Sequence, residues 1–450
     1  MTQGSIAKGL VLYAIPIIIS DFLQQMYNTV DSIIVGRFAG KIALAAVGQS
    51  FFIVNMFLGF FLGISLGVTV AISNFFGARN KDGLSRAIDT GLKLSLVLSV
   101  FFSIAGVLLV PTLLRLVGTT DDVYADGKAY LTIYMAGICA QLMYNMLSGI
   151  LKAIGDSQRP LYVLMFTTCL NVVLDIIFVG PLKMGVSGAA YATIISQVVS
   201  CVILWYIINH TKEFEKPVIR KGGIDMRLVK SIFSVGFPYS FQRTVIAFSN
   251  TIVVSYVNAF GSDYMAGWSC YQKVDQFVIS SILSIGAAMT TFVAQNAGAV
   301  KPDRIKKGVW NGMLLTVIVS AFYAVMIYIF RYPIVRLFSD ETAVVSFGVK
   351  ILEVLCTVHI INALSQVLAG ALRGLGKSLS QMFVLVAIYV VVRQIYLYLR
   401  WPTFHSPMIV VAAYHFTWTI CAVVMTIVYF IVFRKYYNSV MAKNISVQGE

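Results

Sequence analysis

Long apolar runs separated by short polar breaks dominate the sequence. A helix needs about 20 apolar residues to cross a bilayer, whereas the strands of an outer-membrane barrel alternate over about ten. The pattern therefore predicts helical spans and excludes a barrel. Twelve spans are expected, at residues 10–34, 44–75, 90–112, 128–150, 160–180, 186–209, 230–258, 264–297, 308–331, 347–370, 380–400 and 408–433. The second and eighth are especially long, which predicts tilt or extension into water.

Composition and charge support a polytopic membrane protein. The chain is 58% hydrophobic and only 12% charged, against about 25% charged in a soluble domain. Its net charge of +15 does not indicate nucleic-acid binding, because the basic residues lie in the polar breaks. Their distribution predicts that both termini are cytoplasmic. None of the six cysteines forms a CxxC pair, so neither a disulfide framework nor a zinc site is expected.

The two halves of the chain repeat each other. Sliding the sequence by 221 residues aligns the loops at 77–82 and 298–303, and also the stretches 149–157 and 370–378. At an offset of 222, Pro16 aligns with Pro238. The longest polar break lies between the halves and predicts a linker. We therefore expect an all-α integral membrane protein with two pseudo-symmetric six-helix bundles around a central cavity: an N-lobe over 1–215, a cytoplasmic linker over 216–229 and a C-lobe over 230–450. A parallel duplication of this kind is a transporter architecture.

A compact set of polar residues interrupts the spans of the first half. Asp31 lies in the first span, and Asn171 and Asp175 share one helix face of the fifth. A carboxyl at membrane depth is costly, which makes it a functional-site candidate. The alternatives are a position near the membrane interface for Asp31 and helix-to-helix hydrogen bonding for the other two residues. Supporting polar candidates in this half are Gln24, Asn28, Gln141, Tyr144, Asn145 and Gln197.

The second half has different chemistry. Asp275 is expected either to pair with Lys273 or Arg243 or to belong to the substrate cavity with them. His359 and His415 are expected to be core histidines rather than proton carriers. Tyr396 stands where the repeat would place an equivalent of Asp175, so the carboxylate pair is not duplicated.

Two other classes of protein are excluded by motif. The segment 371–378 resembles a nucleotide-binding loop, but it has alanine at the position of the first glycine and follows a helix instead of a strand. No cofactor is therefore expected, and transport should be driven by an ion gradient. No cluster typical of a membrane enzyme is visible, so the chain is not expected to be an enzyme.

These residues resemble the multidrug and toxic compound extrusion (MATE) family. The resemblance lies in YNTVDSIIVGRFAG at 27–40, the glycine-alanine loops, GILKAIGDSQRP at 149–160 and NVVLD at 171–175. It is closest to the bacterial branch with a cation site in the N-lobe. It implies a V-shaped cavity, a coupling site at Asp31, Asn171 and Asp175, and a first helix that bends at Pro16. The other bacterial branch has acids on the seventh and tenth helices, but here the seventh has none, which argues against a second cation site.

The expected function is antiport of organic cations against H⁺ or Na⁺. Either a proton neutralises a carboxyl, or Asp31 and Asp175 are ligands for Na⁺, the one metal considered. The chain is expected to be a monomer in the bacterial cytoplasmic (inner) membrane, with small organic cations and the lipid bilayer as its partners and no nucleic acid. The alternative is a flippase for a lipid-linked or anionic substrate, for which Arg243, Lys273 and Arg393 would supply positive charge.

Overall fold

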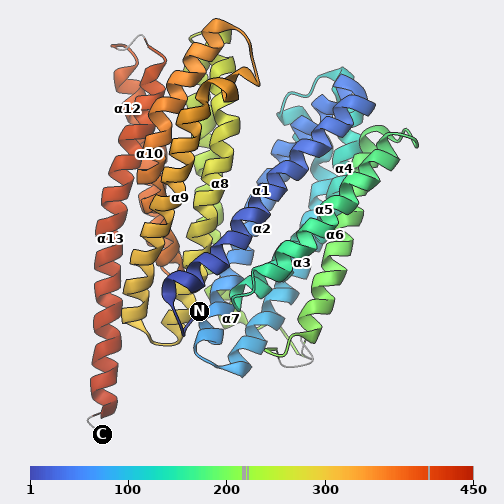
Figure 1. The fold of residues 1–450 in the computed structure, drawn as a ribbon. Helices are drawn as coiled ribbons and strands as arrows, with labels where there is room; N and C mark the ends of the chain where they lie inside the picture. Colours follow the sequence, from blue (N-terminus) through green and yellow to red (C-terminus); the bar gives the residue numbers. More distant parts are fainter. Residues whose placement is uncertain (215–218, 220–221, 404–405, 449–450) are drawn as a thin grey trace. The chain divides into compact units, whose positions relative to one another are not determined.

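The structure is a computed structural model that describes residues 1–214, 219, 222–403 and 406–448. Helices account for nearly all of these residues, and Figure 1 shows them as long rods joined by short loops. Their bounds are α1 Ile6–Phe38, α2 Gly40–Gly77, α3 Lys81–Leu116, α4 Asp121–Ala153, α5 Gln158–Val179, α6 Gly185–His210, α7 Met226–Asn258, α8 Ser262–Gly298, α9 Pro302–Arg336, α10 Thr342–Gly374, α11 Ser378–Val386, the π-helical η1 Ala387–Val392, α12 Arg393–Arg400 and α13 Met408–Gln448. The segments α11, η1 and α12 follow one another without a break. Every element of the described residues is a helix, which confirms the all-helical fold class.

Eleven of the described helices are long and apolar enough to cross a membrane. The twelfth, α7, corresponds to the predicted span 230–258 but falls short in hydropathy. It carries Gln242, Arg243 and Asn250 among its apolar residues. The expected extra length of the second and eighth spans is confirmed, since α2 has 38 residues and α8 has 37. Helix α7 begins at Met226, so the end of the predicted linker 216–229 is helical, and part of that linker lies outside the described residues.

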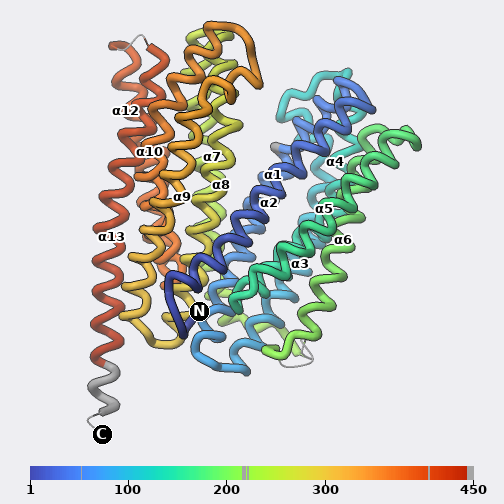
Figure 2. The backbone as a smooth tube through the Cα atoms, viewed as in Figure 1, coloured from blue at the N-terminus to red at the C-terminus, as the bar shows by residue number. Residues whose placement is uncertain are grey.

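The described chain forms two compact units. One comprises Ile19–Ser240, and the other comprises Met1–Ile18 together with Phe241–Glu450. Helices α1 and α7 therefore each pass from one unit to the other. Both transitions come two residues after a proline, at Pro16 and Pro238. Figure 2 draws α1 as one uninterrupted helical tube.

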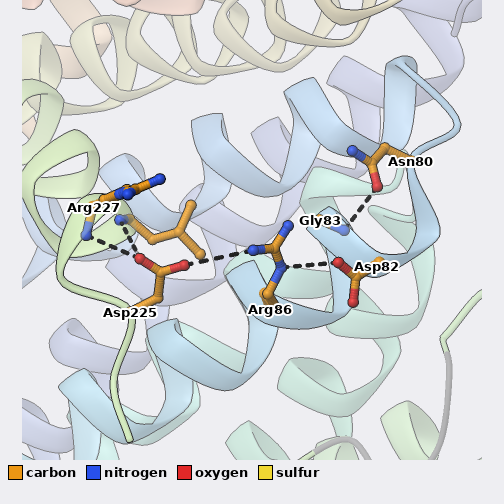
Figure 3. Close-up of polar contacts among 7 residues, drawn as sticks. Asn80, Asp82, Gly83, Arg86, Asp225 and Arg227 are labelled. Atoms are coloured by element: carbon orange, nitrogen blue, oxygen red, sulfur yellow. Dashed lines mark hydrogen bonds and ion pairs between the residues drawn. The ribbon is translucent and has the colours of Figure 1, made fainter.

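The start of α7 is anchored inside the first of these units. Asp225 Oδ1 accepts backbone N–H bonds from Arg227 (2.9 Å) and Leu228 (3.3 Å), which caps the free N–H groups of the helix. Arg86 on α3 lies between Asp82 (3.0 Å) and Asp225 (3.9 Å), as Figure 3 shows. These exposed ion pairs contribute little energy, but they place the first turn of α7 against α3.

The two halves repeat each other in backbone conformation. Arg79 and Val300 both adopt a left-handed φ of 55°, and they are 221 residues apart. Each follows a long helix, and the next residue donates its N–H back into the last turn, from Asn80 to Phe75 and from Lys301 to Asn296. This is the Schellman ending of a helix. The repeated sequence therefore encodes a repeated local structure.

Candidate functional site

Within the unit Ile19–Ser240, helix α1 carries two buried polar side chains on one of its faces. Tyr27 and Asp31 are four residues apart, so they share a face, and both are 8% exposed. Gln24 and Asn28 lie on the same helix and are only half-buried. A carboxyl in the interior of a helix 33 residues long neither caps a helix end nor lies on an exposed surface.

Helix α5 supplies the second carboxyl. Asn171 and Asp175 lie one turn apart and are 1% and 0% exposed. The Asp175 carboxyl interacts electrostatically with that of Asp31. The structure therefore brings the two predicted acids together, although they are far apart in the sequence, and places Asn171 one helical turn from the pair.

Tyrosines surround the two carboxyls. Tyr27 on α1 and Tyr130 on α4 interact electrostatically with both acids, and Tyr134 interacts with Asp31. The rings of Tyr130 and Tyr134 stack with centroids 5.9 Å apart. The Tyr27 hydroxyl donates to Thr193 Oγ1 on α6 at 3.1 Å. The sequence analysis did not select these tyrosines, although the four-residue spacings of Tyr27 to Asp31 and of Tyr130 to Tyr134 were visible signals.

Many polar atoms around this pair lack hydrogen-bond partners among the described residues. They include Asp31 Oδ1, both oxygens of Asp175 and both amide atoms of Asn171. On the neighbouring helices, buried atoms of the same kind are Thr168 Oγ1, Ser196 Oγ and Gln197 Oε1. Buried polar groups normally have partners, and each exception needs an explanation. A bound proton or cation would provide one.

The donor set fits both proposed ions. Two adjacent buried carboxyls can share a proton, because they resist carrying two negative charges together. Carboxylate, amide and hydroxyl oxygens are also hard ligands of the kind that suits Na⁺. The described residues contain no group of three or more His, Cys, Asp or Glu side chains that could hold a metal. A Na⁺ ion would therefore need Asn171 or hydroxyl oxygens in addition to Asp31 and Asp175.

The remaining predictions for α4 and α6 have mixed outcomes. Gln197 is buried on α6, one turn after Thr193. Tyr144 is buried too, but its electrostatic neighbours are Asp21 and Cys201 rather than the acid pair. The backbone carbonyl of Asn145 accepts from Ser65 at 3.2 Å. Gln141 is half-buried.

Asp275 contacts two residues that the sequence analysis did not name as its partners. Its Oδ1 lies 3.0 Å from His359 Nε2 and accepts from the Tyr271 hydroxyl at 2.9 Å. Lys273 is two residues away on the same helix, and side chains at that spacing do not face each other. Its ammonium instead lies 4.8 Å from the centre of the Phe338 ring. Arg243 is exposed on α7. Tyr271 and Asp275 are one turn apart, and His359 could be found opposite them only in three dimensions.

Comparison with known proteins identifies the family. The MatE family model matches twice, over residues 16–177 and 238–399. The chain belongs to the MatE family. The two matches begin at Pro16 and Pro238, which confirms the internal repeat. MatE proteins are transporters, so this chain is a multi-pass membrane transporter and not an enzyme.

Relatives and solved structures agree with this assignment. The chain is 30% identical over 380 residues to the probable multidrug resistance protein YpnP of Bacillus subtilis, covering 84% of both chains. It is 27% identical over 385 residues to the probable multidrug resistance protein YoeA of the same organism, covering 84% of this chain and 83% of YoeA. The fold matches a crystal structure of a MATE protein in a bent conformation with a TM-score of 0.91 at 22% identity, covering 97% and 98% of the two chains.

A second structural match comes from Vibrio cholerae. A mutant of its MATE transporter VcmN has a TM-score of 0.90 at 20% identity, with coverage of 96% of this chain and 98% of VcmN. At this identity the match concerns the fold alone. Within that shared MatE fold, the roles of Asp31, Asn171 and Asp175 rest on the chemistry of this chain.

Proposed function

We propose that this MatE protein is a secondary multidrug efflux transporter that exchanges H⁺ or Na⁺ for organic cations. The observation that carries the proposal is the buried and interacting pair Asp31 and Asp175, in which Asp31 Oδ1 and both Asp175 oxygens receive no hydrogen bond from another group among the described residues. Such a pair is costly in a membrane unless a cation binds it. The names of the two Bacillus subtilis relatives, probable multidrug resistance proteins, support drugs as the cargo.

Coupling would work through helix α1. With no ion bound, two carboxylates that face each other repel. A proton or a Na⁺ ion removes the repulsion and lets α1 pack closely against α5. Because α1 passes into the other unit after Pro16, a change in its packing reaches both units. An ion that binds one arrangement of α1 more tightly than another shifts the population between them, which is what alternating access requires.

The proposed location is the cytoplasmic membrane of a bacterium, with both termini in the cytoplasm. Most Lys and Arg residues lie in the breaks that this orientation places inside. A monomer has all the parts that the proposal needs, because both acids belong to one chain.

The flippase alternative finds less support. An anionic head group requires several basic side chains that converge on one place. Arg393 is 1% exposed and donates through Nε to the Tyr389 carbonyl at 2.8 Å. Lys273 lies over Phe338, and Arg243 is exposed on another helix. Each of the three therefore has its own surroundings.

The test is efflux of ethidium from proteoliposomes, with a pH gradient and a Na⁺ gradient imposed separately. We expect efflux to follow one gradient, which identifies the ion. Asp31→Asn and Asp175→Asn should each reduce it to background, because the pair loses the charge that binds the cation. Asp122→Asn is the matched control, since that carboxyl is exposed in the first turn of α4.

Two results would contradict the proposal. Wild-type efflux in Asp31→Asn would remove the carboxyl of α1 from the mechanism. A folded wild-type protein that moves no ethidium under either gradient would instead favour the flippase, which a fluorescent-lipid translocation assay in the same vesicles would then test.

A further inference from the structure

The repeat between the two halves changes its offset by one residue at the π-helical turn. The stretches 149–157 and 370–378 align at an offset of 221, whereas the two family matches end at residues 177 and 399, which are 222 apart. A π turn closes its backbone hydrogen bond one residue later than an α turn, so it accommodates one extra residue. The π-helical segment Ala387–Val392 lies between these points, and it therefore contains the extra residue.

Burial of the side chains follows the same change of offset. Before the π turn, the buried Thr167 corresponds to the buried Ile388 at an offset of 221. After the turn, the order of buried, half-buried and exposed residues over 171–177 recurs position by position over 393–399, at an offset of 222. The fifth helix of the first half and the rod of α11, η1 and α12 are thus equivalent on both sides of the turn.

This offset assigns counterparts to the two site residues of α5. Arg393 stands in the place of Asn171, and Leu397, rather than Tyr396, stands in the place of Asp175. Arg393 is 1% exposed and Leu397 is 0% exposed, as buried as the residues that they replace. The second half therefore has a guanidinium where the first half has an amide, and an aliphatic side chain where it has a carboxyl.

Helix α7 supplies the counterpart of α1. The offset of 222 between the prolines of α1 and α7 gives Val253 the place of Asp31, and Val253 is 0% exposed. One turn earlier, the Ser249 hydroxyl donates to the Tyr389 carbonyl of the π turn at 3.0 Å. Helix α7 thus meets the π turn beside Arg393, just as α1 meets α5 at the acid pair. Neither carboxyl of that pair is repeated.

The guanidinium of Arg393 is held by a carbonyl and two aromatic rings. Its Nε donates to the Tyr389 carbonyl at 2.8 Å. The ring centres of Tyr414 and Tyr389 lie 4.8 Å and 5.6 Å from the guanidinium carbon. Aromatic faces and carbonyl oxygens both stabilise a positive charge. The surroundings of Arg393 are therefore those of a bound cation, except that this cation belongs to the chain.

The charge on Arg393 is permanent and has an opposite charge nearby. Arginine keeps its proton at every physiological pH. Tyr271 and Tyr414 interact electrostatically with both Arg393 and Asp275, and Asp275 accepts from the Tyr271 hydroxyl at 2.9 Å. A negative and a positive charge thus lie near each other in this half without a mobile ion. The acid pair of the first half has two charges of the same sign, so it requires a cation from solution.

We propose that Arg393 is a tethered cation, which occupies in the C-terminal half the place where the N-terminal half binds its exchangeable ion. Because the guanidinium cannot leave, this half keeps its cation throughout the transport cycle, and ions are exchanged only at Asp31 and Asp175. Removal of the Arg393 side chain should open a site for a free cation beside Tyr389 and Tyr414. The role in transport rests on the proposed function, but binding of a cation at the vacated position does not.

The first experiment is thermal unfolding of the full-length protein in detergent, with millimolar guanidinium or with urea at the same concentration. Urea has the same planar shape as guanidinium but no charge. The background is Asp31→Asn combined with Asp175→Asn, which removes the other cation site. Addition of Arg393→Ala should make guanidinium, and not urea, raise the melting temperature by about 2 °C or more. The background alone should respond to neither compound.

The matched control replaces another arginine of the same helix. Arg400 is exposed at the end of α12, so Arg400→Ala in the same background should show no response to guanidinium. A stabilisation seen with Arg393→Ala and absent with Arg400→Ala locates the cation at the vacated position. It also separates binding from a general effect of the salt on the protein.

Ethidium efflux tests the charge in the otherwise wild-type protein. Arg393→Met has a similar length and suits an apolar interior, but it lacks the charge and should lower efflux at least about tenfold, because the buried Asp275 loses its opposite charge. Arg393→Lys keeps a tethered cation and should retain most of the efflux. Millimolar guanidinium should restore part of the efflux in Arg393→Ala and none in Arg393→Met, where the side chain fills the site.

Two results would overturn the proposal. One is a folded Arg393→Ala variant that guanidinium does not stabilise, or that urea stabilises equally. The other is wild-type efflux in Arg393→Met, and this variant decides the question if Arg393→Ala does not fold. Failure of the proposed transport function has a different signature, since wild-type protein would then move no ethidium under either gradient while guanidinium still stabilised Arg393→Ala.

Discussion

At the scale of single residues, unsatisfied buried polar atoms gather where function is proposed. Asn171 is 1% exposed, and neither of its amide atoms has a partner among the described residues. Leaving a buried polar group unsatisfied costs about 1–3 kcal/mol. A side chain that costs stability and forms no bond in return is typical of a binding site that awaits its ligand.

Asn171→Leu should therefore stabilise the protein and inactivate it. Leucine has a similar size and removes the unsatisfied amide, so the free energy of unfolding should rise by about 1 kcal/mol. Efflux should fall at least about tenfold, the effect of losing roughly 1.4 kcal/mol of ion binding. The melting temperature in detergent and ethidium efflux measure the two effects.

The opposite result has a clear interpretation. If Asn171→Leu lowers the melting temperature, the amide forms a structural hydrogen bond between helices. Asn171 would then belong to the packing of the bundle. Thr193→Val serves as a control, since it removes the acceptor of the Tyr27 hydroxyl and should destabilise by about 1 kcal/mol.

At the scale of elements, two helix endings of the second half satisfy the same backbone requirement with different residues. The ending of α8 requires a left-handed conformation at Val300, where a β-branched side chain is strained. The ending of α10 requires the same conformation at Gly376 and meets it without strain, at a φ of 73°.

Substitutions at these two positions should have opposite signs. Val300→Gly should raise the free energy of unfolding by about 1 kcal/mol, because it relieves the left-handed strain. Gly376→Ala should lower it by a similar amount, although the site has open space around a Cβ. Thermal unfolding in detergent measures both. Equal signs would show that contacts of the side chains outweigh the backbone conformation.

At the scale of the whole molecule, α1 and α7 are the two described helices divided between the units, each two residues after a proline. A proline inside a helix removes one backbone hydrogen bond and weakens the helix locally. Pro16 and Pro238 therefore lie where α1 and α7 leave one unit and enter the other. Pro111 and Pro333 also interrupt helices at an offset of 222, but each lies wholly inside one unit.

These four prolines form a matched set. Pro16→Ala and Pro238→Ala should each slow ethidium efflux about tenfold or more. Alanine restores a backbone hydrogen bond of the helix, and bending the helix then costs additional free energy of about one net hydrogen bond or slightly more. Pro111→Ala and Pro333→Ala should change it less than about twofold, since no unit boundary lies nearby. Equal loss in all four variants would show that the prolines serve folding rather than transport.

The sequence by itself determined the features that depend on neighbours along the chain. Apolar run length predicted the helices, including the unusual length of α2 and α8. Glycine-containing loops at a constant offset predicted the repeat. The four-residue spacing of Asn171 and Asp175 placed both on one buried face. These inferences succeed because helix period, bilayer thickness and turn conformation are local properties.

Only the tertiary structure decided which faces meet. It placed Tyr130 and Tyr134 of α4 beside Asp31, and His359 rather than Lys273 against Asp275. It also divided α1 and α7 between the two units. Each of these outcomes depends on how far a helix is rotated about its own axis and how it is shifted along it. Packing against other helices sets both quantities, and hydropathy along a single helix carries almost no record of either.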